Sequence, residues 1–98
     1  MILYGLKNCD TCRAARKKFP AASFVDVREI PLTLSQLERW SSALGNDLLN
    51  RSSTTWRSLS AAERARDPLA LILEHPALLK RPVIEDGSRV LQGKDALK

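Results

Sequence analysis

The chain has 98 residues, 44% of them hydrophobic, which is enough for one hydrophobic core but not for two. Its formal net charge is +5, but the sixteen Lys and Arg residues are spread along the chain and only 5% of residues are aromatic. This distribution argues against direct nucleic-acid binding, which favours clustered basic residues with aromatics among them. A solvated basic surface explains the charge, and an anionic small molecule or an acidic partner surface is compatible with it.

The apolar stretch at residues 1–4 is too short for a signal peptide or a membrane span. We therefore expect a monomeric cytoplasmic protein with no membrane association. In the reducing cytoplasm a cysteine pair is rarely a structural disulfide, so the two cysteines of this chain need another explanation.

The first third of the chain predicts a strand, a helix and a second strand. Residues 2–4 are apolar and end at Gly5, which predicts a short buried strand. Residues 10–18 predict a helix that Pro20 stops, and residues 23–27 alternate as a second short strand. Two neighbouring parallel strands joined by a helix form a right-handed βαβ unit.

The middle of the chain predicts helices. Thr33 and Gln36 have the spacing of a capping box, and Gly45 ends the helix that follows. Helix-start signals at Ser60 and Asp67 predict a cluster of short helices over residues 47–76. The longer helix carries one apolar stripe, made of Leu34, Leu37, Trp40 and Leu44.

The end of the chain predicts a hairpin. Residues 82–85 and 89–91 form its two strands, and Asp86-Gly87 predicts a type I′ turn. The whole order predicts an α/β protein with a mixed four-stranded sheet, in which a helical insertion separates the βαβ half from the C-terminal β-hairpin. We expect residues 1–98 to form a single domain of this kind.

Residues 9–12, Cys-Asp-Thr-Cys, lie where the first strand gives way to the first helix, and they hold both cysteines. A strand, a Cys-x-x-Cys turn and a helix in this order are typical of thioredoxin-like redox proteins. At the start of a helix, free N–H groups and the helix dipole favour a thiolate at Cys9. Lys7, Arg13 and Arg16 are expected to add positive charge, so Cys9 is the candidate nucleophile.

Cys12 lies one turn into the predicted helix, so we expect it to be the less accessible cysteine and to act as the resolving thiol. Two alternatives were weighed. A zinc site needs two further ligands, and His75 is the only histidine, so no metal site is predicted. The other alternative is that both cysteines are buried only because they pack well as small hydrophobic side chains, and the sequence leaves this open. His75 is explained as a charge beyond a helix end and is assigned no catalytic role.

Three segments resemble the arsenate reductase (ArsC), Spx and YffB family, and the second is closest to the YffB branch. They are residues 5–16 (GLKNCDTCRAAR), residues 49–59 (LNRSSTTWRSL) and residues 75–84 (HPALLKRPVI). The resemblance extends over essentially the whole chain and implies a thioredoxin-like fold with Cys9 as the catalytic thiol.

The resemblance also implies that Arg81 sits beside the thiolate, where its permanently charged guanidinium holds negative charge. We expect the Arg81-Pro82 peptide bond to be cis. The substrate-binding residues predicted around this catalytic set of Cys9, Cys12 and Arg81 are Asn8, Thr11, Arg51, Arg57 and Pro82. For Asn8 and Thr11, local capping of the backbone is an equally good explanation.

Arsenate reductases that work with glutaredoxin use three arginines around the oxyanion, and the matching positions here are Asn50, Arg81 and Gln92. Only one arginine is kept, which does not favour arsenate as the substrate. The resemblance to YffB implies a glutathione-dependent thiol/disulfide reductase, with glutathione or glutaredoxin as partner and no bound cofactor. The alternatives are an Spx-type redox-switched regulator that binds RNA polymerase, for which Cys12 is typical, and an arsenate reductase.

Overall fold

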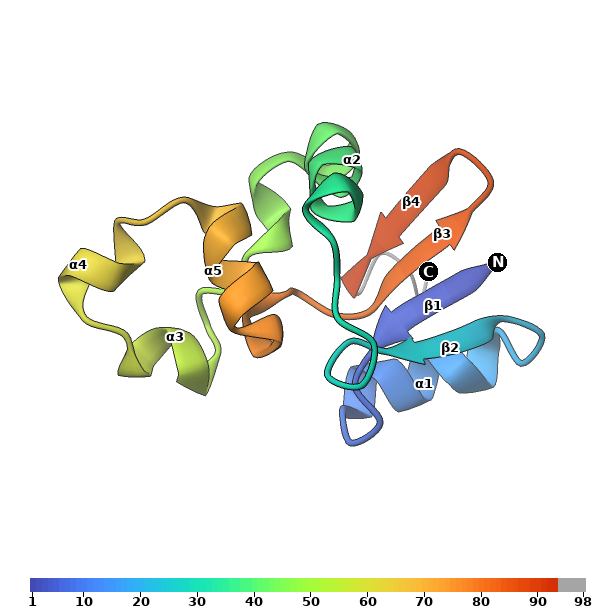
Figure 1. Ribbon diagram of the computed structural model, residues 1–98. Coiled ribbons are helices and arrows are strands. Elements are labelled where there is room, and N and C mark those ends of the chain that lie inside the picture. Colours follow the sequence, from blue (N-terminus) through green and yellow to red (C-terminus); the bar gives the residue numbers. More distant parts are fainter. Residues whose placement is uncertain (94–98) are drawn as a thin grey trace. The chain divides into compact units, whose positions relative to one another are not determined.

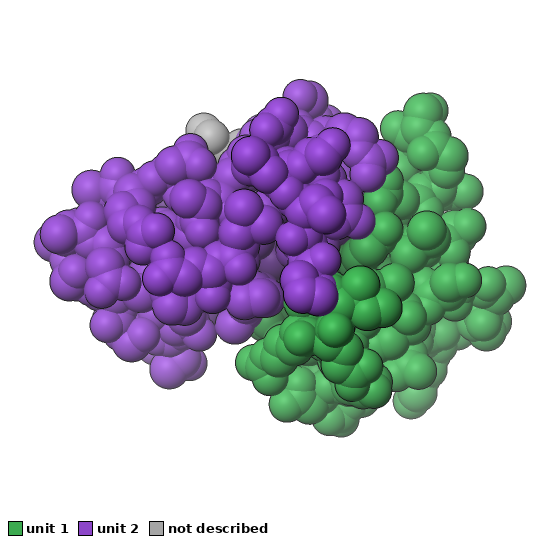
Figure 2. All heavy atoms as spheres, viewed as in Figure 1, with its two compact units in different colours: residues 1–30, 81–98 green, residues 31–80 purple. Residues whose placement is uncertain are grey.

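The computed structural model describes residues 1–93, except for the side chains of Asn46 and Asp47. Two compact units make up the chain, and Figure 2 colours them separately. Unit 1 comprises residues 1–30 and the chain from residue 81 onward, and unit 2 comprises residues 31–80. Each unit is described in turn.

Unit 1 is built on a mixed four-stranded sheet with the order β2-β1-β3-β4 (Figure 1). Strand β1 (Ile2–Gly5) pairs in parallel with β2 (Ser23–Asp26) and antiparallel with β3 (Val83–Asp86). Strand β3 pairs antiparallel with β4 (Arg89–Gln92). The α/β class, the mixed sheet and the helical insertion before the C-terminal hairpin are thereby confirmed.

Helix α1 (Asp10–Lys18) covers one face of β1 and β2 and spans the predicted residues. Leu3, Ala15 and Ile84 form the fully buried core between the helix and this face. Four half-buried apolar side chains pack around that core, namely Phe19, Ala22, Phe24 and Leu91. The helix thus buries one stripe and leaves its basic residues outside.

Gly5, the last residue of β1, lies against α1. A Cβ atom placed on Gly5 would stand 2.5 Å from Cys12 Sγ and 3.2 Å from Cys12 Cβ. The first distance is far inside van der Waals contact. The absence of a side chain at Gly5 therefore allows the strand to approach the first turn of the helix.

The β3–β4 turn differs from the predicted one. Asp86 pairs with Arg89, so the two turn residues are Gly87 and Ser88. Gly87 has a φ of 61°, and no residue other than glycine has a positive φ in the described part of the chain. A type I′ turn needs positive φ at both central residues, so the predicted type was wrong. Glycine at the first central position is typical of a type II′ turn.

Unit 2 is helical. It contains α2 (Leu34–Leu44), α3 (Thr54–Ser58), α4 (Ala61–Arg64) and α5 (Pro68–Glu74), with 3-10 turns η1 (Gly45–Leu48) and η2 (Pro76–Leu78). The predicted capping box is present, because Thr33 Oγ1 accepts from Gln36 N–H and Gln36 Oε1 accepts from Thr33 N–H. Leu37 and Trp40 are fully buried, whereas Leu34 is 48% exposed and does not belong to the buried stripe.

Each short helix begins at a side-chain cap. Ser53 accepts from Trp56 N–H at 3.1 Å, Ser60 from Glu63 N–H at 3.2 Å, and Asp67 from Ala70 N–H at 3.1 Å. Such caps satisfy N–H groups that have no partner within the helix, which matters most where a helix is too short to be stable alone. The helix starts predicted at Ser60 and Asp67 are confirmed.

The two ends of this helical segment are tied together. Leu49 and Leu79 form an antiparallel bridge, Asn50 N–H donates to the Leu78 carbonyl at 2.7 Å, and Lys80 N–H donates to the Leu48 carbonyl at 2.8 Å. The chain thus enters the helical segment at residues 48–50 and leaves it at residues 78–80, and these two stretches are hydrogen-bonded to each other.

None of the helices within residues 1–93 combines the length and the apolar character needed to cross a bilayer. In the same part of the chain, no three His, Cys, Asp or Glu side chains gather in a way that could hold a metal ion.

The close approach at Gly5 is testable with a double-mutant cycle. We expect Gly5→Ala to lower the free energy of unfolding by about 1–3 kcal/mol, because its methyl group overlaps Cys12 Sγ in a packed core. Cys12→Ala removes that sulfur, so the loss of unfolding free energy in the double variant should be smaller than the sum of the losses in the two single variants. Urea unfolding of the four proteins measures this coupling, and strictly additive losses would contradict it.

Candidate active site

Cys9 is the residue immediately before α1, in an extended conformation with φ −99° and ψ 126°. Its carbonyl accepts the first hydrogen bond of the helix from Arg13 N–H at 2.9 Å, and its own N–H donates to the Leu6 carbonyl at 3.3 Å. The thiol is therefore held at the positive end of the helix dipole. Cys9 is partly exposed and Cys12 is buried, as predicted.

The surroundings of Cys9 favour its thiolate. Burial raises the pKa of the Cys9 thiol, but the N–H group and the thiol of Cys12, the charge of Arg81 and the N–H group of Thr11 together outweigh burial and lower the pKa below its usual value. The Cys9 side chain makes no capping hydrogen bond of ordinary geometry, so the N–H groups act mainly through their dipoles. Of the two thiols, Cys9 is thus the one that ionises more readily.

Cys12 has the opposite character. Burial is the main cause that raises the pKa of the Cys12 thiol to about 12, and the hydrogen bond to Cys9 and the charge of Cys9 act in the same direction. The N–H group of Leu6 and the charge of Arg81 lower this pKa but are outweighed. At neutral pH Cys12 is therefore a protonated donor to the sulfur of Cys9. The two thiols therefore differ in protonation: Cys9 loses its proton more readily, and Cys12 keeps its own.

Arg81 lies close enough to both cysteines for its charge to lower the pKa of each. The peptide bond between Arg81 and Pro82 is cis, as predicted, and Pro82 is buried at the start of β3. The Nε and Nη1 atoms of Arg81 are buried and have no hydrogen-bond partner among the described residues. A guanidinium with unpaired donors can accept a carboxylate or another anion.

Three basic side chains predicted to assist Cys9 have other partners instead. Lys7 Nζ lies 2.6 Å from Glu29 Oε1, and Arg13 Nη1 lies 3.3 Å from Asp10 Oδ1. The Arg16 guanidinium lies over the Phe24 ring, 4.4 Å from its centroid. We therefore assign the charge stabilisation of the thiolate to Arg81 and to the start of α1.

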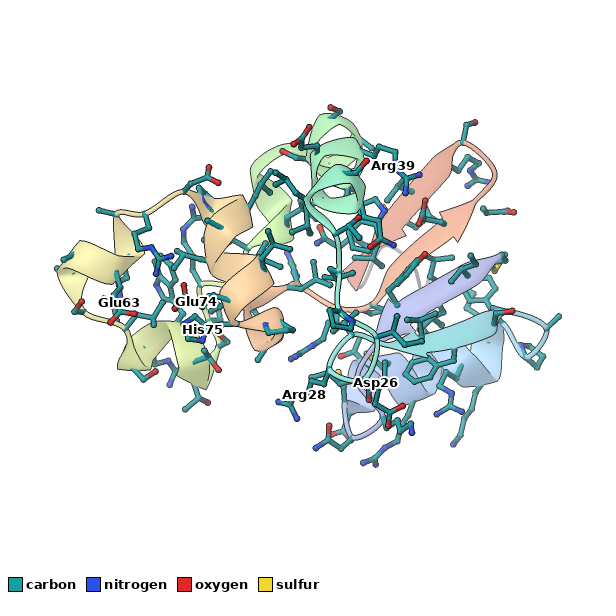
Figure 3. The ribbon with its side chains drawn as sticks, in the orientation of Figure 1. Asp26, Arg28, Arg39, Glu63, Glu74 and His75 are labelled. Atoms are coloured by element: carbon teal, nitrogen blue, oxygen red, sulfur yellow. The ribbon has the colours of Figure 1, made fainter. Side chains whose placement is uncertain are left out.

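Asp26 is a residue of the site that sequence reasoning missed. It is buried at the end of β2, and Figure 3 labels it together with Arg28. Its Oδ2 atom accepts from Lys7 N–H at 3.1 Å, and its Oδ1 atom accepts from Arg28 N–H at 2.9 Å. Lys7 belongs to the loop that leads to Cys9, so Asp26 holds this loop against the end of the strand. An aspartate at the end of a predicted strand was its only signal in the sequence.

The pKa of Asp26 is lowered. Burial raises the pKa of this carboxyl group, but N–H groups of Arg28, Lys7 and Glu29 and the charge of Lys7 lower it by more. The ionised carboxylate is thus the form that holds the loop in place.

The structure places the predicted substrate-binding residues in both units. Asn8 is exposed on the loop before Cys9, and Thr11 is half-buried in the first turn of α1. Together with Pro82 they flank the Cys9 thiol or the Arg81 peptide within unit 1. Arg51 and Arg57 belong to unit 2 and are described there.

Arg51 and Arg57 are exposed in unit 2 and gather near Trp56. The Arg51 guanidinium lies 5.8 Å from the Trp56 ring centroid, and Arg57 Nη2 donates to the Ser52 carbonyl at 2.9 Å. Arg64, which was not predicted, lies 5.4 Å from the same ring and donates to the Trp56 carbonyl. Unit 2 thus presents two guanidiniums at one indole, while the Arg57 guanidinium is held by the Ser52 carbonyl.

The two replaced arginine positions have structural roles. Asn50 Oδ1 accepts from Ser52 N–H at 3.0 Å, which stabilises the turn before α3. Gln92 is buried on β4, opposite Val83. Neither residue carries the charge that an oxyanion site built from three arginines would need.

A comparison with known families decides the relationship of this chain. The ArsC family model matches residues 4–96. The chain belongs to the ArsC family.

Individual relatives agree with this assignment. An uncharacterized protein of Haemophilus influenzae is 34% identical over 100 residues, which cover 93% of this chain and 88% of that protein. Among solved structures, a YffB protein is 36% identical with a TM-score of 0.88, covering 94% of this chain and 89% of the other. A solution structure of an ArsC-related protein from Brucella melitensis is 33% identical with a TM-score of 0.74, covering 94% and 84%.

These matches confirm the family resemblance noted in the sequence and the mixed α/β fold that it implied. They also agree with the similarity of residues 49–59 to the YffB branch. The ArsC fold thus places an activated cysteine at the start of a helix in this protein, and the chemistry of the site follows from the residues around it.

The role of Arg81 is testable through the reactivity of Cys9. In Arg81→Ala the pKa of Cys9 should rise, since a charge that lowers it is removed, so the pH midpoint of iodoacetamide alkylation should shift upward. Arg89→Ala, an exposed arginine on β4, removes the same charge and should leave the midpoint unchanged. Equal midpoints in both variants and the wild type would remove Arg81 from the site.

The role of Asp26 is testable through stability and pH. Asp26→Asn should lower the free energy of unfolding at pH 7 by about 1–3 kcal/mol, because an amide cannot accept both backbone hydrogen bonds equally well. The folded pKa of Asp26 is lowered, so its stabilisation is present above the unfolded pKa and is lost as pH falls through the folded value. Unfolding at pH 7 and at pH 2 should show a smaller difference at pH 2, and a constant difference would refute this.

Proposed function

We propose that this ArsC-family protein is a thiol-redox enzyme, namely a glutathione-dependent thiol/disulfide reductase with Cys9 as its nucleophile. One observation carries the proposal: Cys9 has a lowered pKa at the start of α1, near Arg81, whose buried Nε and Nη1 atoms have no hydrogen-bond partner among the described residues. A thiolate near neutral pH is the species that attacks a disulfide.

In the first step, the Cys9 thiolate attacks the glutathione sulfur of a mixed disulfide. A new bond forms between Cys9 Sγ and that sulfur, the substrate sulfur leaves as a thiolate, and it takes a proton from water. The charge in this step is spread over three sulfurs, and Arg81 with the start of α1 stabilises it at Cys9. Asn8, Thr11 and Pro82 are proposed to contact the substrate around this sulfur.

In the second step, glutathione attacks the mixed disulfide on Cys9 and leaves as glutathione disulfide, which regenerates the Cys9 thiolate. One free glutathione is thus consumed in each cycle, and the other half of the glutathione disulfide comes from the substrate. Cys12 can take the same role by forming a disulfide with Cys9, but its pKa of about 12, raised chiefly by burial, leaves little thiolate at neutral pH. We therefore propose free glutathione, or glutaredoxin, as the main reductant.

Arg51 and Arg57 are proposed to bind a carboxylate of glutathione. Both are exposed in unit 2, and no described carboxylate pairs with either of them. This is the property that a site for a carboxylate needs.

A second candidate function is an Spx-type regulator that binds RNA polymerase and is switched by oxidation of the cysteine pair. The hydrogen bond between the thiols of Cys9 and Cys12 favours it, because it brings together the two sulfurs that a disulfide would join. Arsenate reduction is supported only by family membership, since Asn50 and Gln92 replace two of the three expected arginines.

The test is NADPH consumption by the purified protein with glutathione and glutathione reductase. We expect turnover of a small mixed glutathione disulfide and none of arsenate. Cys9→Ser should reduce the rate to background, whereas Cys12→Ser should keep most of it, because glutathione resolves the intermediate. Turnover of arsenate would show that Asn50 and Gln92 permit oxyanion chemistry. No NADPH consumption with either substrate, together with co-purification of RNA polymerase, would favour the regulator.

A further inference from the structure

A groove in unit 1 lies between α1 and β2, outside the Cys9 site. It encloses about 440 Å³ and is open to solvent on one side. We call its apolar lining residues, Leu3, Phe19, Ala22 and Phe24, its floor, and its exposed basic lining residues, Arg13, Arg16 and Lys17, its rim; Pro20 completes the lining. We call it the α1–β2 groove.

The floor of the groove consists of side chains at the edge of the unit 1 core. Leu3 and Phe24 are paired in the β1–β2 register, so their side chains point to the same face of the sheet, the one that α1 covers. Phe19 and Phe24 pack against this core but are only half-buried. Apolar surface is therefore left uncovered at the edge of the sheet.

The rim is cationic for a simple geometric reason. Arg13, Arg16 and Lys17 are spaced by three and four residues, so they lie on one side of α1. Arg13 pairs with Asp10 at 3.3 Å, but both side chains are exposed and such a pair contributes little. Among residues 1–93, no carboxylate pairs with Arg16 or Lys17.

We infer that the α1–β2 groove binds a segment of a partner protein in which acidic residues flank an aromatic or aliphatic side chain. The apolar side chain would lie on Phe19 and Ala22, beside the Phe24 ring that the Arg16 guanidinium covers, and the acidic residues would face Arg13, Arg16 and Lys17. This complementarity does not depend on the chemistry of Cys9 and is independent of the proposed function.

Other ligands fit the groove less well. Small-molecule sites commonly bury about 70–90% of the ligand, and this groove is open to solvent. Nucleic acid would need free aromatic faces for base stacking, but the Arg16 guanidinium already covers the Phe24 ring at 4.4 Å. A peptide is also favoured because β2, as the edge of the described sheet, has a strand neighbour on one side only.

The experiment is fluorescence anisotropy with a labelled hexapeptide of four glutamates around a central Leu-Phe pair. We expect the double variant Arg16→Ser, Lys17→Ser to bind at least about tenfold more weakly than the wild type, since charges at the contact are lost. The matched control is Arg28→Ser, Arg89→Ser, which removes two exposed positive charges elsewhere in unit 1 and should bind like the wild type. Equal weakening in both double variants would overturn the proposal, because bulk charge would then explain the binding.

Two further measurements keep the test independent of how well the variants fold. A peptide with Ser-Ser in place of Leu-Phe should bind the wild-type protein much more weakly, and equal binding would show that the apolar floor is not used. In amide NMR spectra of the wild type, the acidic peptide should shift residues 13–24 most. Shifts spread over the whole protein, or tighter binding of an oligothymidylate to residues 13–24, would overturn the assignment to an acidic peptide.

Discussion

The packing of β1 against the first turn of α1 is the contact on which the site depends. With no side chain at Gly5, the strand lies so close to Cys12 that its sulfur is fully removed from water. That burial raises the pKa of Cys12 and keeps it protonated, so it can donate to Cys9. The same packing fixes where the helix begins, and hence which cysteine lies at its positive end. The close approach of Gly5 to Cys12 thus accounts for the burial of Cys12 and for its raised pKa.

Much of the fold could be predicted because its signals are local. The start of α2 follows from Thr33 and Gln36, the starts of α4 and α5 follow from Ser60 and Asp67, and the mixed sheet follows from the order of short apolar segments. Each helix start depends on residues within four positions of one another, and each strand on a short run of neighbouring residues. The prediction of Cys12 as the less accessible cysteine succeeded for the same reason, since helix spacing alone turns it inward.

The misses concern long-range partners. The sequence places Lys7 and Arg16 near Cys9, but Glu29 and Phe24, which engage them in the structure, come from the other end of the βαβ unit. Asp26 was missed because its function is to accept N–H groups from a loop nineteen residues earlier in the chain. The turn type was wrong because the strand register, and not the Asp-Gly pair, decides which two residues turn. In each case the deciding contact joins segments that no local pattern relates.

The bridge between Leu49 and Leu79 has a consequence for how such a chain can vary. The hydrogen bonds from Asn50 N–H to the Leu78 carbonyl and from Lys80 N–H to the Leu48 carbonyl hold the two ends of the helical segment side by side. These bonds join backbone atoms. Exposed residues between these two stretches can therefore be exchanged without loss of the backbone hydrogen bonds that precede Arg81. Relatives can therefore acquire different surfaces in this segment while keeping the arginine and the cysteine pair, which allows one thiol site to serve different partners.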